Sequence, residues 1–370
     1  MKILHLINTL SAGGAELHLL TLCRYLKQAG VEVVVGYLKE GRSKPLRQEF
    51  EANGVPVNPL GGDSVWNVRY FARARRWVVR EQPDILHTHL PRADLVGRLL
   101  KAAGVCIPWV VSVHGIYSKH WRGKWSLPFF SYIWRRADAV IAISHAVKEW
   151  LVIEREIPQV KVHVVHYGIE IDRFAYHQQP RQGREGSPII GTIGRLEPIK
   201  GHETLIQAMP LVLQRYPQAR LLIVGHDPYG YGASLRGLIQ SLGLDGKVQL
   251  LGFVEDIPSF LNDIDIFVFA SRSEGFGQVL IEAMAAGKPV VASRIPPITE
   301  IVLDGETGFL APPEQPEAFA QAILKVLSDH KRMYRMGQAG RQRVEEYFNA
   351  KRMTEEIVKV YQRCLDNLMM

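Results

Sequence analysis

The sequence has few cysteines and no long apolar run, and each shortage excludes a class of protein. No apolar stretch approaches the roughly 18 residues that span a bilayer, so we predict no membrane-spanning helix. Cys23, Cys106 and Cys364 lie far apart and form no Cys-x-x-Cys motif. This pattern supports neither a disulfide framework nor a thiolate metal site, and it fits a cytoplasmic protein.

Acidic residues are scarce in the first half of the chain. Residues 1–182 contain 25 lysines and arginines against 15 aspartates and glutamates, a formal charge of +10. Residues 183–370 contain 20 against 22, a formal charge of −2. The basic excess therefore belongs to the first half, which predicts that this half meets an anionic surface, either membrane or nucleic acid.

Two stretches of this half contain no acid at all. Residues 69–80 carry five arginines, and residues 117–136 carry five basic residues and seven aromatics, with Pro128 predicting a split into two short helices. Basic residues beside aromatics are typical of segments that bind an anionic membrane. The alternative is that the aromatics pack in the core, and nucleic acid is less favoured because no nucleic-acid motif is present. The aromatics at helical spacing are Trp121, Trp125, Phe129 and Tyr132.

Both halves alternate short β-branched stretches with helical ones. This rhythm is typical of parallel sheets covered by helices on both faces. It restarts after residues 177–187, a polar stretch with glycine and proline that we interpret as a linker. The expected strands are residues 2–8, 31–38, 84–89, 108–115 and 139–144, then 188–194, 219–225, 247–253, 265–271, 288–293 and 308–312.

We therefore predict an α/β protein with two doubly wound, Rossmann-like domains that face a cleft. The expected domains are residues 1–180 and residues 181–352. The helical end of the chain, about residues 316–368, is expected to break near Gly337 and Gly340. Ligands in such sheets bind beyond the carboxyl ends of the strands, so we look for the site there.

Two features at expected strand ends suit an anionic ligand. Gly13 and Gly14 lie between a strand and a helix, whose first amides attract anions; the alternative is a tight turn without function. Arg195 and Lys200 follow another strand. Arginine as a fork and lysine as a point charge suit a diphosphate, and the alternative is a pair of solvated charges.

The stretch SEGFGQVLIEAM, residues 273–284, predicts a second anion site and two carboxylates. Glu274 lies in a loop, whereas Glu282 lies in the helix that follows. Acid–base work would need both carboxylates to face one reacting atom, so we interpret them as anchors for sugar hydroxyls. The helix N-terminus offers the amides of Phe276, Gly277, Gln278 and Val279.

Together these motifs resemble the retaining glycosyltransferases of family four, which have the GT-B fold. The pattern comprises GGAE, GRLEPIKG and EGFGQVLIEAMAAGKPVVA, with DILHTHLPRADLVGRL, SVHG and AISHAVKEWL, and it covers nearly the whole chain. The resemblance implies that the first domain takes the acceptor and the second holds a nucleoside-diphosphate sugar. It also implies that residues 353–370 form a helix that crosses back to the first domain.

The resemblance implies roles for the matching residues of the second domain. Arg195 and Lys200 would hold the donor diphosphate, which leaves as the sugar transfers. Glu274 would anchor hydroxyls of the transferred sugar, and Glu282 would hold the ribose of the nucleotide. The spacing of the two glutamates would then serve two ends of one donor.

In the first domain the resemblance places Gly14 close to the donor phosphates and His114 beside the donor sugar, near the reacting carbon. It also implies a front-face route in which the leaving phosphate helps to take the acceptor proton, so that no enzymic base is needed. One position departs from the family: Tyr167 stands where many relatives have an asparagine before glycine. Asparagine tolerates left-handed backbone better than tyrosine, so we expect a differently shaped turn.

We predict neither a metal ion nor a cofactor, the nucleotide sugar being a substrate. Asp263 and Asp265 form the Asp-x-Asp motif of another glycosyltransferase class, but they run straight into an apolar strand. His87 and His89 share one face of a strand, without a third zinc ligand in view.

The sequence thus predicts a metal-independent retaining glycosyltransferase. A UDP-sugar is the first choice of donor and GDP-mannose the second, with a glycan or lipid-linked acceptor in cell-envelope or exopolysaccharide assembly. We expect a cytoplasmic enzyme attached peripherally to the inner face of the membrane. One alternative is a nucleotide-sugar epimerase that hydrolyses its donor, whose acid–base set we do not find. The other is a non-catalytic basic module that binds membrane or nucleic acid, against which the donor constellation argues.

Overall fold

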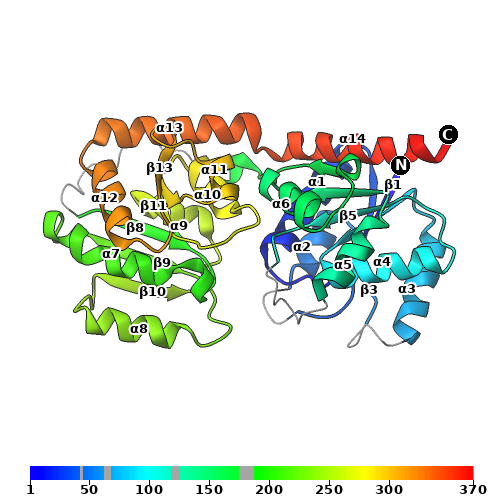
Figure 1. Cartoon of the computed structure of the whole chain (residues 1–370), viewed down its shortest axis with the longest axis horizontal. Helices are drawn as coiled ribbons and strands as arrows, with labels where there is room; N and C mark the ends of the chain where they lie inside the picture. Colours follow the sequence, from blue (N-terminus) through cyan, green and yellow to red (C-terminus); the bar gives the residue numbers. More distant parts are fainter. Residues whose placement is uncertain (42–44, 62–67, 118–125, 175–186, 370) are drawn as a thin grey trace. The chain divides into compact units, whose positions relative to one another are not determined.

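The computed structural model describes residues 1–41, 45–61, 68–117, 126–174 and 187–369 of the chain. It divides into two compact units, Met1–Ile169 with Asn349–Met370 as unit 1 and Glu170–Phe348 as unit 2 (Figure 1). Both boundaries between the units, after Ile169 and before Asn349, come earlier in the sequence than the expected ones. Ile169 and Asn349 form a parallel bridge, which holds these two residues together within unit 1. Residues 177–186 of the expected linker lie outside the described residues.

Unit 1 contains a parallel sheet in the order β3-β2-β1-β4-β5-β6-β7. Nearly every position of the central strands β1, β4 and β5 is buried, as expected where helices cover both faces, whereas the edge strands β3 and β7 are more exposed. In the strand register His5 of β1 lies opposite His87 of β4, which sets two imidazoles side by side on neighbouring strands. His89 of β4 lies opposite Ser112 of β5. The strands are β1 (Lys2–Ile7), β2 (Glu32–Tyr37), β3 (Val57–Pro59), β4 (Ile85–His89), β5 (Trp109–Val113), β6 (Ala139–Ala142) and β7 (Val162–Val164).

Helices α1 (Gly14–Gln28) and α14 (Ala350–Met369) pack together on one face of this sheet, and α14 is the red helix of Figure 1. The other face carries α3 (Val68–Glu81), α4 (Pro91–Ala102) and α5 (Ser126–Arg135). Close packing on this face needs glycine, because a side chain on Gly36 would meet the Trp77 ring at 2.4 Å. The remaining helices of unit 1 are α2 (Arg47–Ala52) and α6 (His145–Glu149), the latter continued by a π-helical turn over Trp150–Glu154.

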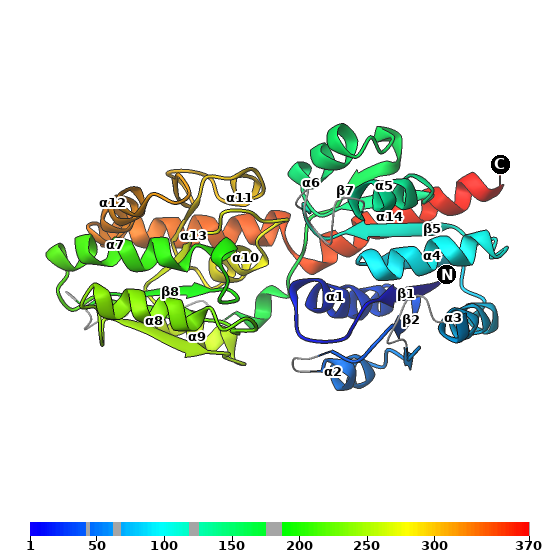
Figure 2. The same ribbon diagram turned by 60° about the horizontal axis from the view of Figure 1, so that its bottom comes forward.

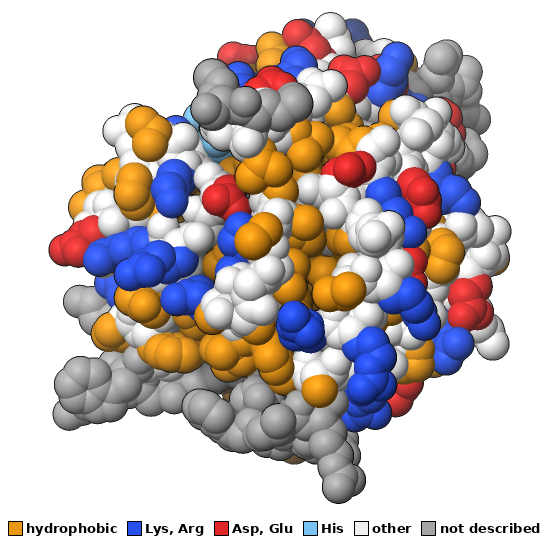
Figure 3. Space-filling view, turned by 90° about the vertical axis from the view of Figure 1, so that its right-hand side faces the viewer, with side chains coloured by type: hydrophobic (Ala, Val, Ile, Leu, Met, Phe, Trp, Pro, Cys, Tyr) orange, Lys and Arg blue, Asp and Glu red, His pale blue; other side chains and the backbone are white. Residues whose placement is uncertain are grey.

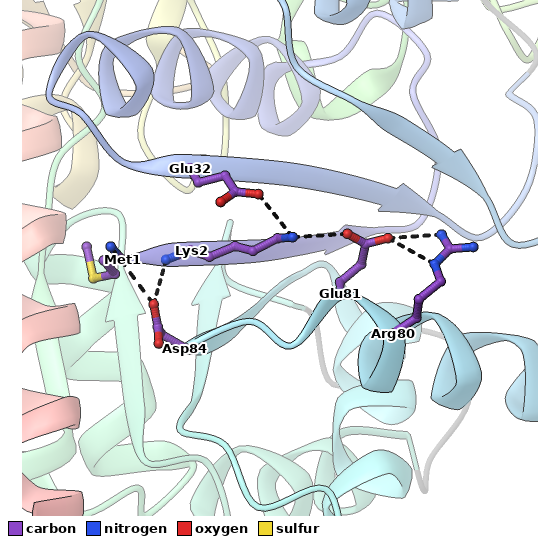
Figure 4. A network of polar contacts seen from close by, with 6 residues as sticks. All are labelled: Met1, Lys2, Glu32, Arg80, Glu81 and Asp84. Atoms are coloured by element: carbon purple, nitrogen blue, oxygen red, sulfur yellow. Dashed lines mark hydrogen bonds and ion pairs between the residues drawn. The ribbon is translucent and has the colours of Figure 1, made fainter.

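A charged network fastens the amino ends of the strands (Figure 4). The Lys2 ammonium lies 3.0 Å from Glu32 Oε1 and 3.1 Å from Glu81 Oε2, while its backbone amide donates to Asp84 Oδ2 at 2.6 Å. The hydrogen bond to Glu32 raises the pKa of Lys2. Arg80 pairs with Glu81 at 2.9 Å, so the charge of this α3 arginine is compensated inside the network.

Unit 2 contains a parallel sheet in the order β10-β9-β8-β11-β12-β13. The chain order therefore reverses at β8, which lies between β9 and β11. Both units are sheets with helices on both faces (Figures 1 and 2), which confirms the predicted pair of Rossmann-like α/β bodies. The strands are β8 (Ile189–Ile193), β9 (Arg220–Val224), β10 (Val248–Gly252), β11 (Ile266–Phe269), β12 (Val290–Ser293) and β13 (Gly308–Ala311).

One apolar core of unit 2 joins the sheet to α7, α8 and α12. Ile190, Ile266 and Val268 point into this core from β8 and β11. On the other face, Gly191 leaves room for Ile264 and for Phe260 of α9. The helices of unit 2 are α7 (His202–Arg215), α8 (Gly232–Ser241), α9 (Ile257–Asp263), α10 (Gln278–Ala285), α11 (Pro296–Ile301), α12 (Pro316–Leu327) and α13 (His330–Tyr347).

The prediction that the terminal helical stretch breaks near Gly337 and Gly340 is wrong. Helix α13 runs through both glycines, and it packs against α10. A side chain on Gly337 would come within 2.1 Å of the Gly287 carbonyl oxygen, so this glycine permits close approach of the backbones. Gly340 has more room, with Met284 Cγ as the nearest atom at 3.4 Å.

We expect Gly337→Ala to destabilise the protein and Gly340→Ala to leave it as stable or slightly more stable. Alanine is better than glycine in a helix by up to about 1 kcal/mol, but at 337 its methyl group meets a backbone carbonyl. Overpacking of this kind typically costs about 1–3 kcal/mol. Chemical denaturation of the two variants measures the difference, and equal midpoints would contradict the packing argument.

Candidate active site

The loops that follow β8 and β11 meet at the reversal of the sheet of unit 2. The Ile199 carbonyl accepts the amide of Arg272 at 2.8 Å and the hydroxyl of Ser271 at 3.1 Å. Doubly wound sheets bind ligands at such a reversal, beyond the carboxyl ends of the strands. The two loops carry most of the residues that the sequence singled out.

The structure brings Lys200 and Glu274 together, although 74 positions separate them in the sequence. Their side chains form an ion pair of 2.6 Å, with 18% and 12% of each side chain exposed. Arg195 instead pairs with Glu197 at 2.8 Å and is more than half exposed. Glu197 and the pairing of Lys200 with Glu274 were not predicted, because nothing in the local spacing indicates which charges meet.

Two glycines give these loops their course. Gly201, which precedes α7, has a φ of 64°, and a side chain there would come within 2.1 Å of the Ala270 carbonyl oxygen. Gly277, which precedes α10, has a φ of 108°. Both positions lie in the region that favours glycine. The turn at Gly277 lets α10 begin at Gln278, so of the four residues named for this N-terminus Gln278 and Val279 lie in the helix, whereas Phe276 and Gly277 precede it. That their amides bind an anion stays a prediction.

Glu282 lies within α10 and is partly buried. Gln278 donates to Glu282 Oε1 at 3.0 Å from one turn earlier in the same helix. Burial raises the pKa of Glu282 from 4.5 to about 7, against this hydrogen bond and the charge of Arg173, which both lower it. Sequence reasoning missed Arg173, which lies in the 3₁₀ turn Ile171–Arg173 and carries no motif.

In unit 1 the predicted glycine turn contains a carboxylate that the sequence analysis did not use. Gly13 precedes α1, and Gly14 is the first residue of this helix. Glu16 is buried in the first turn and accepts the Thr9 hydroxyl at 3.1 Å. A side chain on Gly13 would meet Glu16 Oε2 at 2.6 Å, so Gly13 makes room for this carboxylate. The nearness of Gly14 to donor phosphates stays a prediction.

His114 follows β5 directly, and both of its ring nitrogens are hydrogen-bonded inside unit 1. Nε2 lies 3.1 Å from His89 Nδ1, and Nδ1 lies 2.5 Å from the Tyr167 hydroxyl. Tyr167 is buried and does not adopt a positive φ. Tyr167, where the chain departs from the family, therefore places a phenol hydroxyl against His114 and needs no left-handed backbone.

Five histidines gather between the sheet of unit 1 and helices α1 and α14. Four of them are buried, namely His5, His18, His87 and His89. The fifth, His114, is partly exposed. The sequence predicted that His87 and His89 share a face but missed His5, which β1 brings beside them. Only the strand order reveals that neighbour.

The nitrogens of His5, His87 and His89 lie within 4.8 Å of one another, so the structure supplies the third imidazole that the sequence lacked. Zinc–nitrogen bonds are about 2.0–2.1 Å. His87 is already bonded to Ser112 Oγ at 2.8 Å and to the Tyr361 hydroxyl at 2.7 Å, while His5 Nδ1 and His89 Nε2 lie 3.0 Å apart. An ion would have to displace these contacts, so the arrangement favours a hydrogen-bonded cluster.

The Asp-x-Asp motif is tied into the fold of unit 2. Asp265 Oδ2 accepts the Ile189 amide at 2.7 Å, which joins the start of β11 to the start of β8. Asp263 is the last residue of α9. The contact of Asp265 lies at the amino ends of the strands, whereas Lys200 and Glu274 follow their carboxyl ends.

Two Rossmann-like units of this kind are the architecture of the GT-B class of glycosyltransferases. Residues 12–173 match the family described as Glycosyltransferase Family 4, and residues 175–343 match the family described as Glycosyl transferases group 1. The chain therefore belongs to glycosyltransferase family 4, which confirms the resemblance seen in its motifs.

Individual proteins agree with this assignment. A phosphatidyl-myo-inositol mannosyltransferase of Mycobacterium tuberculosis is 30% identical, over 95% of this chain and 93% of its own. The capsular polysaccharide biosynthesis glycosyltransferase CapM of Staphylococcus aureus is 27% identical, over 76% of this chain and 77% of its own. The crystal structure of Anabaena Alr3699/HepE in complex with UDP and glucose is similar with a TM-score of 0.86 at 25% identity, over 98% of this chain and 99% of that one.

We expect Glu282→Gln to become more stable relative to the wild type as the pH rises from 4.5 to about 7. Between these values the folded wild type binds a proton that the unfolded chain has lost, so its free energy of unfolding falls with pH. The amide does not titrate, and above pH 7 the difference between the proteins should be constant. Denaturation of both proteins at four pH values across this range measures it, and a pH-independent difference would refute the raised pKa.

Proposed function

We propose that this chain is a retaining, metal-independent glycosyltransferase that moves a sugar from a UDP-sugar to a glycan or lipid-linked acceptor of the cell envelope. One observation carries the proposal: Lys200, Glu274 and the loop that leads into α10 meet at the sheet reversal of unit 2. A cation, a carboxylate and helix amides there suit the diphosphate and hydroxyls of a nucleotide sugar.

The names of the relatives support the same class of donor and acceptor. Alr3699/HepE was crystallised with UDP and glucose, the mycobacterial relative is named for a lipid acceptor, and CapM is named for capsular polysaccharide. A UDP-sugar remains our first choice. GDP-mannose is the second, because the mycobacterial enzyme is a mannosyltransferase.

The ion pair of Lys200 and Glu274 prepares opposite charges for two parts of one donor. The ammonium would take the diphosphate while the carboxylate accepts sugar hydroxyls, so the pair would separate as the donor enters. Negative charge grows on the diphosphate as the bond to the sugar carbon breaks. Lys200, Arg195 and the α10 amides would therefore bind the transition state more tightly than the ground state.

Retention follows if the acceptor oxygen bonds to the sugar carbon on the face that the diphosphate leaves. The acceptor proton would then pass to the departing phosphate oxygen, which balances the transfer without an enzymic base. The bonding of both His114 nitrogens within unit 1 supports this route, because neither nitrogen is then open to take a proton.

Transfer assays with a panel of UDP-sugars and GDP-mannose, in the presence of EDTA, test the proposal. We expect transfer to lipid or glycan acceptors from a UDP-sugar, with the anomeric configuration of the donor retained in the product by NMR. Arg195, Lys200 and the helix amides would replace the metal ion, so EDTA should have no effect. An inverted product, an absolute need for manganese or magnesium, or donor hydrolysis without any glycosylated product would each contradict it.

Calorimetry should separate the roles of the two glutamates. We expect Glu282→Ala to weaken binding of both free UDP and the UDP-sugar, because Glu282 is assigned to the ribose. Glu274→Ala should weaken only the intact donor; it removes the partner of Lys200 and so leaves a free cation for the diphosphate. A lost charge-assisted hydrogen bond is worth about 1.5–3 kcal/mol. Equal losses for both ligands in both variants would overturn this assignment.

We further propose that unit 1 binds an anionic membrane on the inner face of the cell, through α3, α4 and α5. On the face of unit 1 in Figure 3, lysine and arginine side chains gather beside hydrophobic ones. In α5, Phe129 and Tyr132 are 45% and 48% exposed, while Phe130 and Trp134 are buried in the core. Trp121 and Trp125 lie outside the described residues. No described helix is long and apolar enough to cross a bilayer.

The charges beside these aromatics support an anionic surface. Arg136 and Arg98 lie 4.9 and 6.0 Å from the Tyr132 ring centroid. On α3, Arg75 and Arg76 are exposed, and α3 and α5 both pack against α4. Each basic residue near an anionic membrane contributes about 1 kcal/mol, so several together would hold the protein reversibly.

Flotation with liposomes tests this attachment. The protein should float with anionic vesicles at low salt, and both high salt and the double change Phe129→Ser with Tyr132→Ser should release it. Val160→Ser is the matched control, because Val160 is 85% exposed in unit 1 but lies outside α3, α4 and α5. If the wild type fails to float at low salt, or if the control releases it equally, the membrane surface is wrong.

A further inference from the structure

A chain of hydrogen bonds crosses the sheet of unit 1 and ends at His114 and Tyr167. His5 Nδ1 lies 3.0 Å from His89 Nε2, and His89 Nδ1 lies 3.1 Å from His114 Nε2. His114 Nδ1 lies 2.5 Å from the Tyr167 hydroxyl. The contacts pass from β1 through β4 and β5 to the loop after β7, so residues far apart in the sequence form one series.

Each contact between two neutral imidazoles holds a single proton, which couples the three rings. If Tyr167 donates to His114, then His114, His89 and His5 must all carry their proton on Nε2. If the protons run the other way, all three carry it on Nδ1. A mixed arrangement would set two N–H groups or two lone pairs against each other at one of the contacts.

The surroundings keep these rings uncharged. Burial lowers the pKa of His5 and of His114 to about 3, and it lowers the pKa of His89 well below its usual range. Geometry acts in the same direction: a second proton on His114 would either oppose the proton that His89 donates or force the Tyr167 hydroxyl to turn from donor to acceptor. His18 of α1 stacks on the Tyr167 ring with centroids 4.2 Å apart, which holds the phenol in place.

We propose that Tyr167 and His89 are positioning residues that hold His114 in one orientation and one uncharged tautomer, through a hydrogen-bonded chain that begins at His5. The value of this rests on the proposed function, in which His114 lies near the reacting sugar carbon. Positive charge develops on the sugar in glycosyl transfer, and an imidazolium beside it would oppose that charge. A neutral imidazole held by Tyr167 and His89 does not oppose that charge.

The tautomers can be read directly by NMR of protein labelled with nitrogen-15 histidine, without any substrate. Single His→Gln variants assign the signals. We expect His5, His89 and His114 of the wild type to show the same tautomer, all Nε2–H or all Nδ1–H. A different tautomer on any one of them, or a charged ring at neutral pH, would contradict the proposed hydrogen-bonded chain.

Tyr167→Phe tests the positioning role, with Tyr361→Phe as the matched control. Both are buried tyrosines whose hydroxyl contacts a histidine Nδ1. Tyr361, however, contacts His87, which is not part of the hydrogen-bonded chain from His5 to Tyr167. Tyr167→Phe should change the nitrogen signals of His114 and lower kcat by about ten- to a hundredfold through misplacement of the ring, with a smaller change in donor KM. The control should change neither.

The outcomes separate this inference from the proposed function. If Tyr167→Phe shifts the His114 signals but leaves kcat unchanged, the positioning role is wrong while the transferase assignment stands. If both tyrosine variants lower kcat equally, the effect is general destabilisation and the positioning role is again wrong. If the wild type transfers no sugar from any donor, the proposed function fails. The tautomers of His5, His89 and His114 in the wild type still show whether the hydrogen-bonded chain forms.

Discussion

Parallel strand pairing with a reversal of order is the constraint on which the candidate site depends. Because β8 lies between β9 and β11, the connections from β8 and from β11 run to opposite sides of the sheet, and the loops that open these connections lie next to each other at the carboxyl edge. The Ile199 carbonyl binds the second loop to the first at this point. Lys200 and Glu274 meet because their loops do.

The charged groups of unit 2 differ in how they are compensated. The Lys200 and Glu274 charges compensate each other, so neither charge is buried without a partner, which would cost free energy. Glu282 has no lysine or arginine within salt-bridge distance among the described residues, and burial accordingly raises its pKa to about 7. Under the proposed function, ribose hydroxyls would supply the hydrogen bonds that this carboxylate lacks.

Unit 1 buries a cluster of histidines between the sheet and two helices, which removes their polar ring nitrogens from water. Buried polar atoms are tolerated when they are hydrogen-bonded, and most of these ring nitrogens bind one another, Ser112, Tyr361 or Tyr167. His5 Nε2 and His18 Nδ1 have no partner among the described residues.

Much of this fold could be predicted from local sequence. The alternation of β-branched and helical stretches gave the two α/β bodies, because side-chain period and burial decide secondary structure locally. The motifs also located Lys200, Glu274 and the start of α10, since each depends on a few adjacent residues. Gly337 and Gly340 misled the prediction because local sequence does not show whether a glycine breaks a helix or, as at Gly337, lets two backbones pack closely.

Local sequence was therefore sufficient to predict most of the strands, the family and the residues that follow the strands of the site. Which of these residues contact one another depends on the tertiary fold, which brings together Lys200 and Glu274, His5 and His89, and Tyr167 and His114. It also decided which aromatics of α5 are core and which are exposed. These pairings depend on strand order and on the helices that cover each face, and such long-range contacts leave no periodic trace in the chain.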